Sequence, residues 1–500
     1  MKHWSLKQWG ALSTLSFAVL MVSLDITVVS VAIPSIERDL HLDFEHLQWI
    51  VNAYTLSYGS LLLAAGACAD RCGRRRIFLF GIVLFAAASA ACGFAFNGIF
   101  LNVARAAQGA GGACVASCSM ALVASTFEAR DRSMAYGIWA TAGGLGLALG
   151  PTFGGQILSQ SNWHWIFFIN LPVALWIALL VPKLLRESAI GSAGRFDFPG
   201  FACFTPGLIA LIYALMRGNH LGWSNLSEIS LIALALSLLS VFVAVERRSS
   251  HPMFDLKLFA VPSFIGVLVV AVAASVGYWS LFVYVPLYLT RAAQLGAAEI
   301  GLALLPLSLP MLIVPPFAAR LSRLLAPQVQ FAGGLAIIGL ADLALASAIH
   351  AEFGIAIPLL TAGTGAGLIN AQITHVAIGV VPGDRTGMAA GISATSRQFG
   401  YALGVAGLGA VITSTSHSAL VDGLAMRADL ALEVTAAARE LGNSNLPVMA
   451  RFPEALQRLL FGLVGQSFAE GFHAALLVAA AVSFTGAALA AMLVRRTDLC

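Results

Sequence analysis

The sequence has few charged residues. Asp, Glu, Lys and Arg together make up 10% of the 500 residues, whereas 59% are hydrophobic and the net charge is only +4. Soluble domains carry roughly a quarter charged residues, and the mean hydropathy here is +0.86. This composition argues against a soluble fold and against a nucleic-acid partner. It favours a lipid bilayer as the surroundings of the chain.

Motifs of catalysis and metal binding are also lacking. The sequence contains no G-x-S-x-G, H-E-x-x-H, Walker loop or C-x-x-C. Its seven cysteines include two i,i+4 pairs, but no histidine cluster accompanies them, so we interpret them as fillers of Ala-rich helices. No enzyme, metal site or cofactor is expected. A membrane sensor or enzyme remains only a remote alternative.

Long apolar runs dominate what is present. A helix needs about 20 apolar residues to span a bilayer. Runs of this kind begin near Leu12, Trp49, Ile77, Ile99, Met134, Trp165, Pro199, Ser227, Phe264, Ile300, Phe331, Ile355, Gly391 and His473. The first contains Asp25 and no A-x-A cleavage pattern, so it is interpreted as a retained span. The sequence predicts an all-α integral membrane protein of about fourteen spans.

The spans divide into two sets of six with two more between them. We expect an N-terminal six-helix bundle at 1–190, two inserted spans and a linker at 191–260, and a C-terminal bundle at 261–500. An extracytoplasmic loop with amphipathic helices is expected at 416–472. Glycine stripes in the fifth span of each set support the repeat: Gly146, Gly150 and Gly154, and then Gly400, Gly404 and Gly407.

Basic residues are distributed unequally between the predicted loops. About 19 lie on the side of both termini, whereas the short loops of the other side hold only Arg38, Arg217 and Arg291. By the positive-inside rule the termini are cytoplasmic. The predicted location is a bacterial plasma (inner) membrane.

The loop between the second and third spans reads GACADRCGRRRIF. It resembles the G-x-x-x-D-R-x-G-R-R signature of the major facilitator superfamily at Gly66, Asp70, Arg71, Gly73, Arg74 and Arg75. We predict a gate in which Asp70 faces the N-terminus of the helix that starts near Gly391, and Arg74 pairs with Glu128. A loop that only sets the topology is the alternative.

Spans one and four each carry one charged residue within an apolar run, and the two charges are opposite. SLDITVVSVAIPSI resembles a signature of the fourteen-span drug:proton antiporters (QacA/EmrB type), with Ser30 at a position usually held by Asn, and LNVARAAQGAGG resembles the superfamily pattern around Arg105. Asp25 and Arg105 lie at similar depths, and an unpaired arginine in hydrocarbon is costly. We predict that protonation of Asp25 releases Arg105 and couples proton flow to transport. A static ion pair is the alternative.

Two further motifs resemble the same family. GLGLALGPTFGG, with Gly146, Gly150, Pro151, Gly154 and Gly155, resembles the antiporter pattern G-x-x-x-G-P-x-x-G-G, which is associated with exporters. We expect it to kink its helix and to pack between the halves. WHWIFFINLP, from Trp163 to Pro172, resembles a family motif at the start of span six and is interpreted as an interfacial anchor.

The substrate cavity is predicted from aromatic and polar residues in spans expected to face the centre. The candidates are Trp49, Asn52, Tyr54, Gln108, Tyr278, Tyr284, Tyr288, Asn370, Gln372 and His375. Such a lining suits a flat, partly apolar ligand. Asp25 and Asp342 are the only clear acids within the spans, which favours a neutral or weakly anionic, ring-containing solute over a multiply charged cation.

The resemblance implies two six-helix bundles that alternate in access to the two sides of the membrane. The leading hypothesis is proton-coupled export of small amphipathic compounds, with the proton gradient as energy source and no cofactor. Uptake of a metabolite or vitamin-like solute is the alternative, because fold does not decide direction. The sequence leaves open the substrate, the oligomeric state and whether a periplasmic adaptor is a partner.

Overall fold

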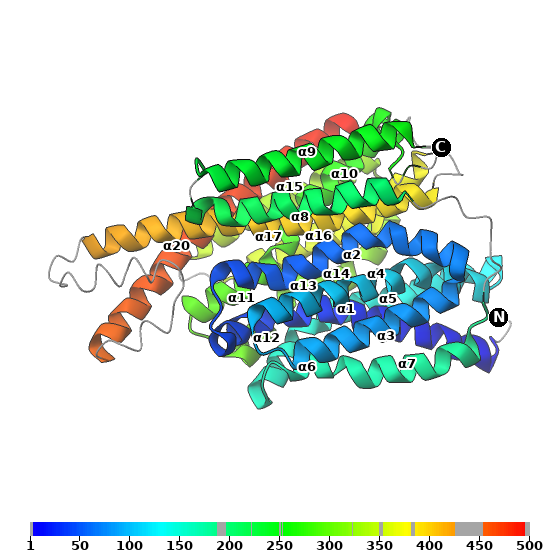
Figure 1. The fold of residues 1–500 in the computed structure, drawn as a ribbon, viewed down its shortest axis with the longest axis horizontal. Coiled ribbons are helices and arrows are strands. Elements are labelled where there is room, and N and C mark those ends of the chain that lie inside the picture. Colours follow the sequence, from blue (N-terminus) through cyan, green and yellow to red (C-terminus); the bar gives the residue numbers. More distant parts are fainter. Residues whose placement is uncertain are drawn as a thin grey trace.

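The computed structural model describes residues 4–187, 197–221, 223–249, 252, 254–322, 324–349, 354–381, 386–425 and 454–495. The side chains of a few residues within these ranges, Asp70 among them, are outside the description. The regular elements in the described ranges are all helices. They lie side by side in one elongated body, and the chain ends marked N and C lie at the same end of it (Figure 1).

The N-terminal bundle begins with helices that have clear start signals. Ser5 forms a capping box before α1 (Leu6–Leu40), Asp43 caps α2 (Phe44–Cys72), and Asn97 caps α4 (Gly98–Thr126). Each satisfies amide groups that the first helical turn leaves without a partner. The remaining helices are α3 (Arg74–Gly93), α5 (Ala129–Gln160), α6 (Trp165–Phe168) and α7 (Asn170–Leu184).

Two helices are inserted between the bundles. They are α8 (Phe198–Leu221) and α9 (Leu226–Arg248), and they pack against each other. The apolar face of α8 meets α2 and α17 in a cluster that includes Leu56, Ile212 and Ala402. The apolar side chains of α9, such as Leu234 and Leu236, are more than half exposed. Lipid contact suits this outer face.

The C-terminal bundle repeats the six-helix plan with broken helices. Its first run is α10 (Pro262–Ala274), the π-helical turn η2 (Ser275–Trp279) and α11 (Leu281–Arg291), after a 3-10 turn η1 (Leu256–Ala260). Its second is α12 (Ala297–Ala303), α13 (Leu305–Ser308) and α14 (Pro310–Leu321), interrupted near its prolines. Then follow α15 (Pro327–Ile349), α16 (Ala356–Gly379), α17 (Thr386–Ala425) and α20 (Glu454–Leu493).

Eleven helices or helix runs among the described residues are long and apolar enough to cross a membrane. The long helices α2, α5 and α16 are not among these eleven, yet they have 29, 32 and 24 residues. Each exceeds the roughly 20 residues that a span requires. The fold is therefore a multi-pass helical membrane protein.

The region predicted as a loop at 416–472 is largely helical where it is described. Residues up to Ala425 continue α17, and residues from Glu454 onward already belong to α20, each a helix of 40 residues. Both helices project beyond their neighbours at the end opposite the marked termini (Figure 1). The expected start of the last span, His473, therefore lies well inside α20. The rest of the predicted loop lies outside the described residues.

Candidate functional site

A buried ion pair joins α1 to α4. Arg105 Nη1 lies 2.7 Å from Asp25 Oδ2. Arg105 is 2% exposed and Asp25 is 0% exposed. An isolated charge at this depth costs several kcal/mol, and the opposite charge offsets much of that cost. The predicted juxtaposition of these two residues is thus present in the structure.

Two amide side chains complete the surroundings of the carboxylate. Gln108 Nε2 donates to Asp25 Oδ1 over 2.8 Å, and Asn170 Nδ2 donates to the same oxygen over 3.0 Å. Asn170 also donates to Ser89 Oγ, which in turn donates to the carbonyl oxygen of Phe167. Asp25 therefore accepts from three side chains on two other helices. We call Asp25, Arg105, Gln108 and Asn170 the charge centre.

The guanidinium of Arg105 is held on several sides. Its Nε donates to the carbonyl oxygen of Ile50 over 3.1 Å, and its Nη1 donates to Gln108 Oε1 over 2.8 Å. Its Cζ lies 4.4 Å from the ring centre of Tyr54, within the range of a cation–π contact. Helices α1, α2, α4 and α7 all contribute to this centre. A change of charge on Asp25 would therefore alter contacts among four helices.

The turn of the signature loop between α2 and α3 is made by a glycine, Gly73. Gly73 has φ of 102°, and a Cβ there would lie 2.6 Å from the carboxylate of Glu187. Glu187 accepts from the backbone amide of Arg75 over 3.0 Å, and its Oε2 lies 3.7 and 3.8 Å from Nε of Arg75 and Arg76. Glu187, just after α7, was missed from the sequence because it lies far along the chain in an unremarkable segment.

Other predictions for this loop have different outcomes. A Cβ at Gly66 would meet no atom within 4 Å, so no close contact in this structure requires a glycine at that position. Arg71 is exposed. The side chain of Asp70 lies outside the described set, so its role stays a prediction. The pairing of Arg74 with Glu128 also stays a prediction.

The glycine motif of α5 serves two interfaces. Cβ atoms at Gly146, Gly150 and Gly154 would collide with Leu20, Thr27 and Val28 of α1, so these glycines pack within the N-terminal bundle. Other residues of the motif meet the other bundle: a Cβ at Gly155 would lie 2.5 Å from the carbonyl oxygen of Ala297, Gly301 lies against Pro151, and Ser308 Oγ donates to the carbonyl oxygen of Ala148. The expectation that the motif packs between the halves therefore holds for Pro151 and Gly155, but is wrong for Gly146, Gly150 and Gly154.

The bundles are joined at the end opposite the termini. Glu37 at the end of α1 forms an ion pair with Arg291 at the end of α11. Gln48 Nε2 on α2 donates to Tyr284 Oη over 3.1 Å and to the carbonyl oxygen of Val405 on α17 over 2.8 Å. The Tyr284 hydroxyl donates to the same carbonyl. We call this set the outer seal; opening between the bundles at this end must break it.

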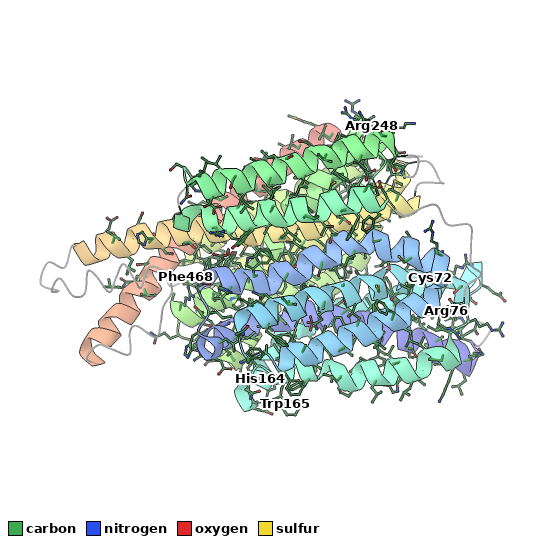
Figure 2. The ribbon with its side chains drawn as sticks, viewed as in Figure 1. Cys72, Arg76, His164, Trp165, Arg248 and Phe468 are labelled. Atoms are coloured by element: carbon green, nitrogen blue, oxygen red, sulfur yellow. The ribbon has the colours of Figure 1, made fainter. Side chains whose placement is uncertain are left out.

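The two ends of the molecule differ in chemistry. Cys72, Arg76 and Arg248 lie toward the end of the chain termini, whereas His164, Trp165 and Phe468 lie toward the other (Figure 2). The signature loop is thus at the basic end, and the outer seal is at the other.

Comparisons with known proteins agree with this architecture. The Major Facilitator Superfamily model matches residues 15–405. The chain belongs to the Major Facilitator Superfamily. Membership in this superfamily of transporters marks the chain as a membrane transporter and not an enzyme.

Two relatives and one solved structure are similar to the chain over most of its length. The chain is 34% identical to the multidrug resistance protein Stp of Mycobacterium tuberculosis, over 79% of this chain and 74% of that protein. It is 30% identical to the tetracenomycin C resistance and export protein of Streptomyces glaucescens, over 97% and 91%. A crystal structure of an inward-facing, unoccupied bacterial homologue of the human lysosomal transporter Spinster has a TM-score of 0.67, at 18% identity, with 100% and 99% coverage, which supports the fold.

The ten residues predicted to line the substrate cavity do not lie around one common cavity in the structure. Trp49 contacts the Tyr213 ring at 5.9 Å, and Asn52 donates to Met216 Sδ over 3.5 Å, so both face the inserted helix α8. Tyr54 and Gln108 contact Arg105 in the charge centre. Tyr284 belongs to the outer seal.

The remaining candidates lie in the C-terminal bundle. Tyr278 and Asn370 line a cavity of about 10 Å³ together with Arg397, whose Nη1 donates to Asn370 Oδ1 over 3.2 Å. That volume holds about one water molecule, so it is no substrate chamber in this conformation. The Tyr288 ring packs on Phe472, Gln372 is buried and His375 is exposed.

Proposed function

We propose that this chain exports small amphipathic or ring-containing compounds in exchange for protons. The names of its relatives, a multidrug resistance protein and an antibiotic resistance and export protein, support the direction. The charge centre supports the coupling, and it is the observation that carries the proposal. A carboxylate that has one guanidinium and two amide donors exists in two charge states with different hydrogen-bond demands.

The mechanism follows from the contacts of Asp25. When Asp25 binds a proton it loses its negative charge, so the attraction that holds Arg105 Nη1 at 2.7 Å is weakened. Arg105 then keeps the Ile50 carbonyl and Gln108 as acceptors, and the contacts among α1, α4 and α7 rearrange. Such a change can shift the balance between two bundle arrangements, because differential stability is what moves such an equilibrium.

The finer assignment is part of the same proposal. We infer a fourteen-span drug:proton antiporter of the QacA/EmrB type, because α8 and α9 are inserted between two six-helix bundles and α2, α5 and α16 have the length of spans. We place the basic end with both termini in the cytoplasm of a bacterium, following the positive-inside rule. The proton gradient supplies the energy, and a periplasmic adaptor is a candidate partner.

Everted membrane vesicles test direction and coupling together. Respiring vesicles with an acidic lumen are monitored with a pH-sensitive acridine dye while tetracenomycin C, puromycin and neutral aromatic compounds are added one at a time. Export by antiport predicts proton loss from the lumen on addition of a transported compound. Asp25→Asn should abolish this signal, and Glu299→Gln, a change at an exposed carboxylate outside the charge centre, should retain it.

Two results would contradict the proposal. Entry of the compound into the lumen together with protons, instead of in exchange for them, would identify the protein as an uptake system that works by symport. Transport that persists unchanged in Asp25→Asn, or in the presence of an uncoupler, would remove proton coupling through the charge centre.

A further inference from the structure

A second buried acid lies in the C-terminal bundle. Asp342 on α15 is 0% exposed, and neither of its carboxylate oxygens has a hydrogen-bond partner among the described residues. An ionised carboxylate without a partner is very costly in a low-dielectric interior. The arrangement seen here therefore fits the neutral, protonated acid.

The carboxyl of Asp342 faces a glycine on the π-helical turn. A Cβ at Gly277 would lie 3.3 Å from Asp342 Oδ2 and would collide with Ser483 Oγ of α20. The hydroxyl of Ser483 is buried too and has no acceptor among the described residues. Two polar groups without hydrogen-bond partners thus lie next to Gly277. Because glycine has no side chain, there is room for both groups at this point. π-helical turns of this kind are frequent at functional sites.

The position repeats the charge centre of the other bundle. In the N-terminal bundle, Asn170 of the last helix joins Asp25 of the first helix to Ser89 of the third. In the C-terminal bundle, Ser483 of the last helix and Asp342 of the third meet at Gly277 of the first helical run. Ser89 and Asp342 even occupy the same position counted from the first residues of α3 and α15. The acid lies on the first helix in the N-terminal bundle and on the third helix in the C-terminal bundle.

The two acids differ in the charges around them. Asp25 is paired with Arg105, whereas the carboxyl oxygens of Asp342 have no hydrogen-bond partner among the described residues. The elements packed against α15 are α10, η2, α16 and α20, and Gln330 of α15 also contacts α14. Their described ionisable side chains are Tyr278, which donates to the Leu307 carbonyl, Arg320, His375, Glu470 and His473. None of these five side chains hydrogen-bonds to the Asp342 carboxyl.

We propose that Asp342 is a second exchangeable proton-binding group, placed in the C-terminal bundle opposite the charge centre. This inference rests on the proposed proton-coupled function and extends it from one bundle to two. In the conformation described here the proton is held on the carboxyl. When the bundle rearranges, the proton passes to water, which becomes hydronium, and the hydroxyl of Ser483 turns to donate to the carboxylate.

The site favours a proton over a metal cation for a steric reason. Ser483 Oγ, Ile338 Cγ2 and Asp342 Oδ2 all lie within 3.3 Å of the point where a Gly277 Cβ would be. A coordinated cation needs several oxygen ligands arranged around a vacant centre. A proton needs no additional space.

Infrared difference spectroscopy tests the proposal without requiring a known substrate. The full-length protein in lipid nanodiscs is titrated in ordinary and heavy water, and the carbonyl stretch of protonated carboxyl groups is followed. The wild type should show such a band at low pH that disappears as the pH rises. One component of the band should be missing in Asp342→Asn and present in both the wild type and Asp25→Asn, and this component is assigned to Asp342. Glu299→Gln is the control for an exposed acid.

Ser483→Ala gives a second measurement that keeps the carboxyl itself. Loss of the hydroxyl donor should move the midpoint of the Asp342 band to higher pH by about one unit, the equivalent of one ordinary hydrogen bond. A spectrum of Asp342→Asn that lacks no band of the wild type, or a band that belongs to Asp342 but never titrates, would overturn the proposal. Neither outcome depends on transport, so failure of the proposed function is recognised separately by the vesicle experiment.

Discussion

Asn170 on α7 donates to the same oxygen of Asp25 that accepts from Gln108 on α4. The two donors lie 3.0 and 2.8 Å from that oxygen, while Arg105 occupies the other one. The last helix of the bundle is thereby tied to the charge state of the first. This relationship makes Asn170 a positioning residue for the proposed proton exchange.

Asn170→Ala should shift the pH dependence of transport. It removes a donor that stabilises the ionised form of Asp25, so protonation should occur at higher pH. Because a lost hydrogen bond to a charged group is worth about 1.5–3 kcal/mol, we expect the profile to move upward by about one pH unit or more. Asn102→Ala is the matched control, since Asn102 lies on α4 but contacts the His46 carbonyl instead. An unshifted profile would refute this role.

Arg105→Lys should impair transport although it conserves the positive charge. One guanidinium contacts Asp25, Gln108 and the Ile50 carbonyl at once, and an ammonium group cannot reproduce that planar set of donors. We expect the rate of proton-driven transport to fall about tenfold or more, with normal membrane insertion. Arg38→Lys, at an exposed side chain that donates only to the Pro34 carbonyl among the bonds described, should transport normally. Wild-type rates in Arg105→Lys would show that charge alone suffices.

Gly150→Ala should lower the thermal stability of the purified protein. The new methyl group would collide with Thr27 of α1, and overpacking of this kind costs about 1–3 kcal/mol. Gly137→Ala is a control on the same helix α5, because a Cβ there meets nothing within 4 Å. We expect a drop of several degrees in Tm for the first variant and no drop for the second. Equal melting of both would mean that α5 does not pack on α1 in this way.

The two glycines of the signature loop should behave differently. Gly73→Ala forces a side chain into a backbone conformation with φ of 102° and against Glu187, so we expect loss of transport or a lower Tm. Gly66→Ala should have little effect, because its surroundings are open. Glu187→Gln should be mild, about 1 kcal/mol or less, because its pairs with Arg75 and Arg76 are partly exposed. A severe defect in Gly66→Ala would contradict the described geometry.

The sequence was informative where a single residue is costly to bury. Asp25 and Arg105 were identified because charges in an apolar run require a partner, and similar depth on neighbouring helices limits the choice. Asn170 was inside a quoted motif but was interpreted as part of an interfacial anchor. An amide carries no charge, so no energetic penalty in the sequence indicates which neighbour it contacts.

The substrate cavity was beyond sequence reasoning for a different reason. Which face of a helix points to the centre depends on rotation and on neighbours, and the inserted helix α8 covers the face of α2 that carries Trp49 and Asn52. Asp342 was noted only as one of two acids within the spans, because its relation to Ser89 becomes visible only when the two bundles are compared in space. The repeat was predicted from glycine stripes, but its polar equivalents were not.

Proton exchange at Asp25 is the central claim, and proteoliposomes that hold the purified protein test it most directly. A transported aromatic compound identified in the vesicle screen is placed on both sides, and an imposed pH gradient is the only driving force. The wild type should concentrate the compound against its own gradient, and Asp25→Asn should only equilibrate it while still exchanging labelled compound. Accumulation by Asp25→Asn equal to that of the wild type would contradict the account.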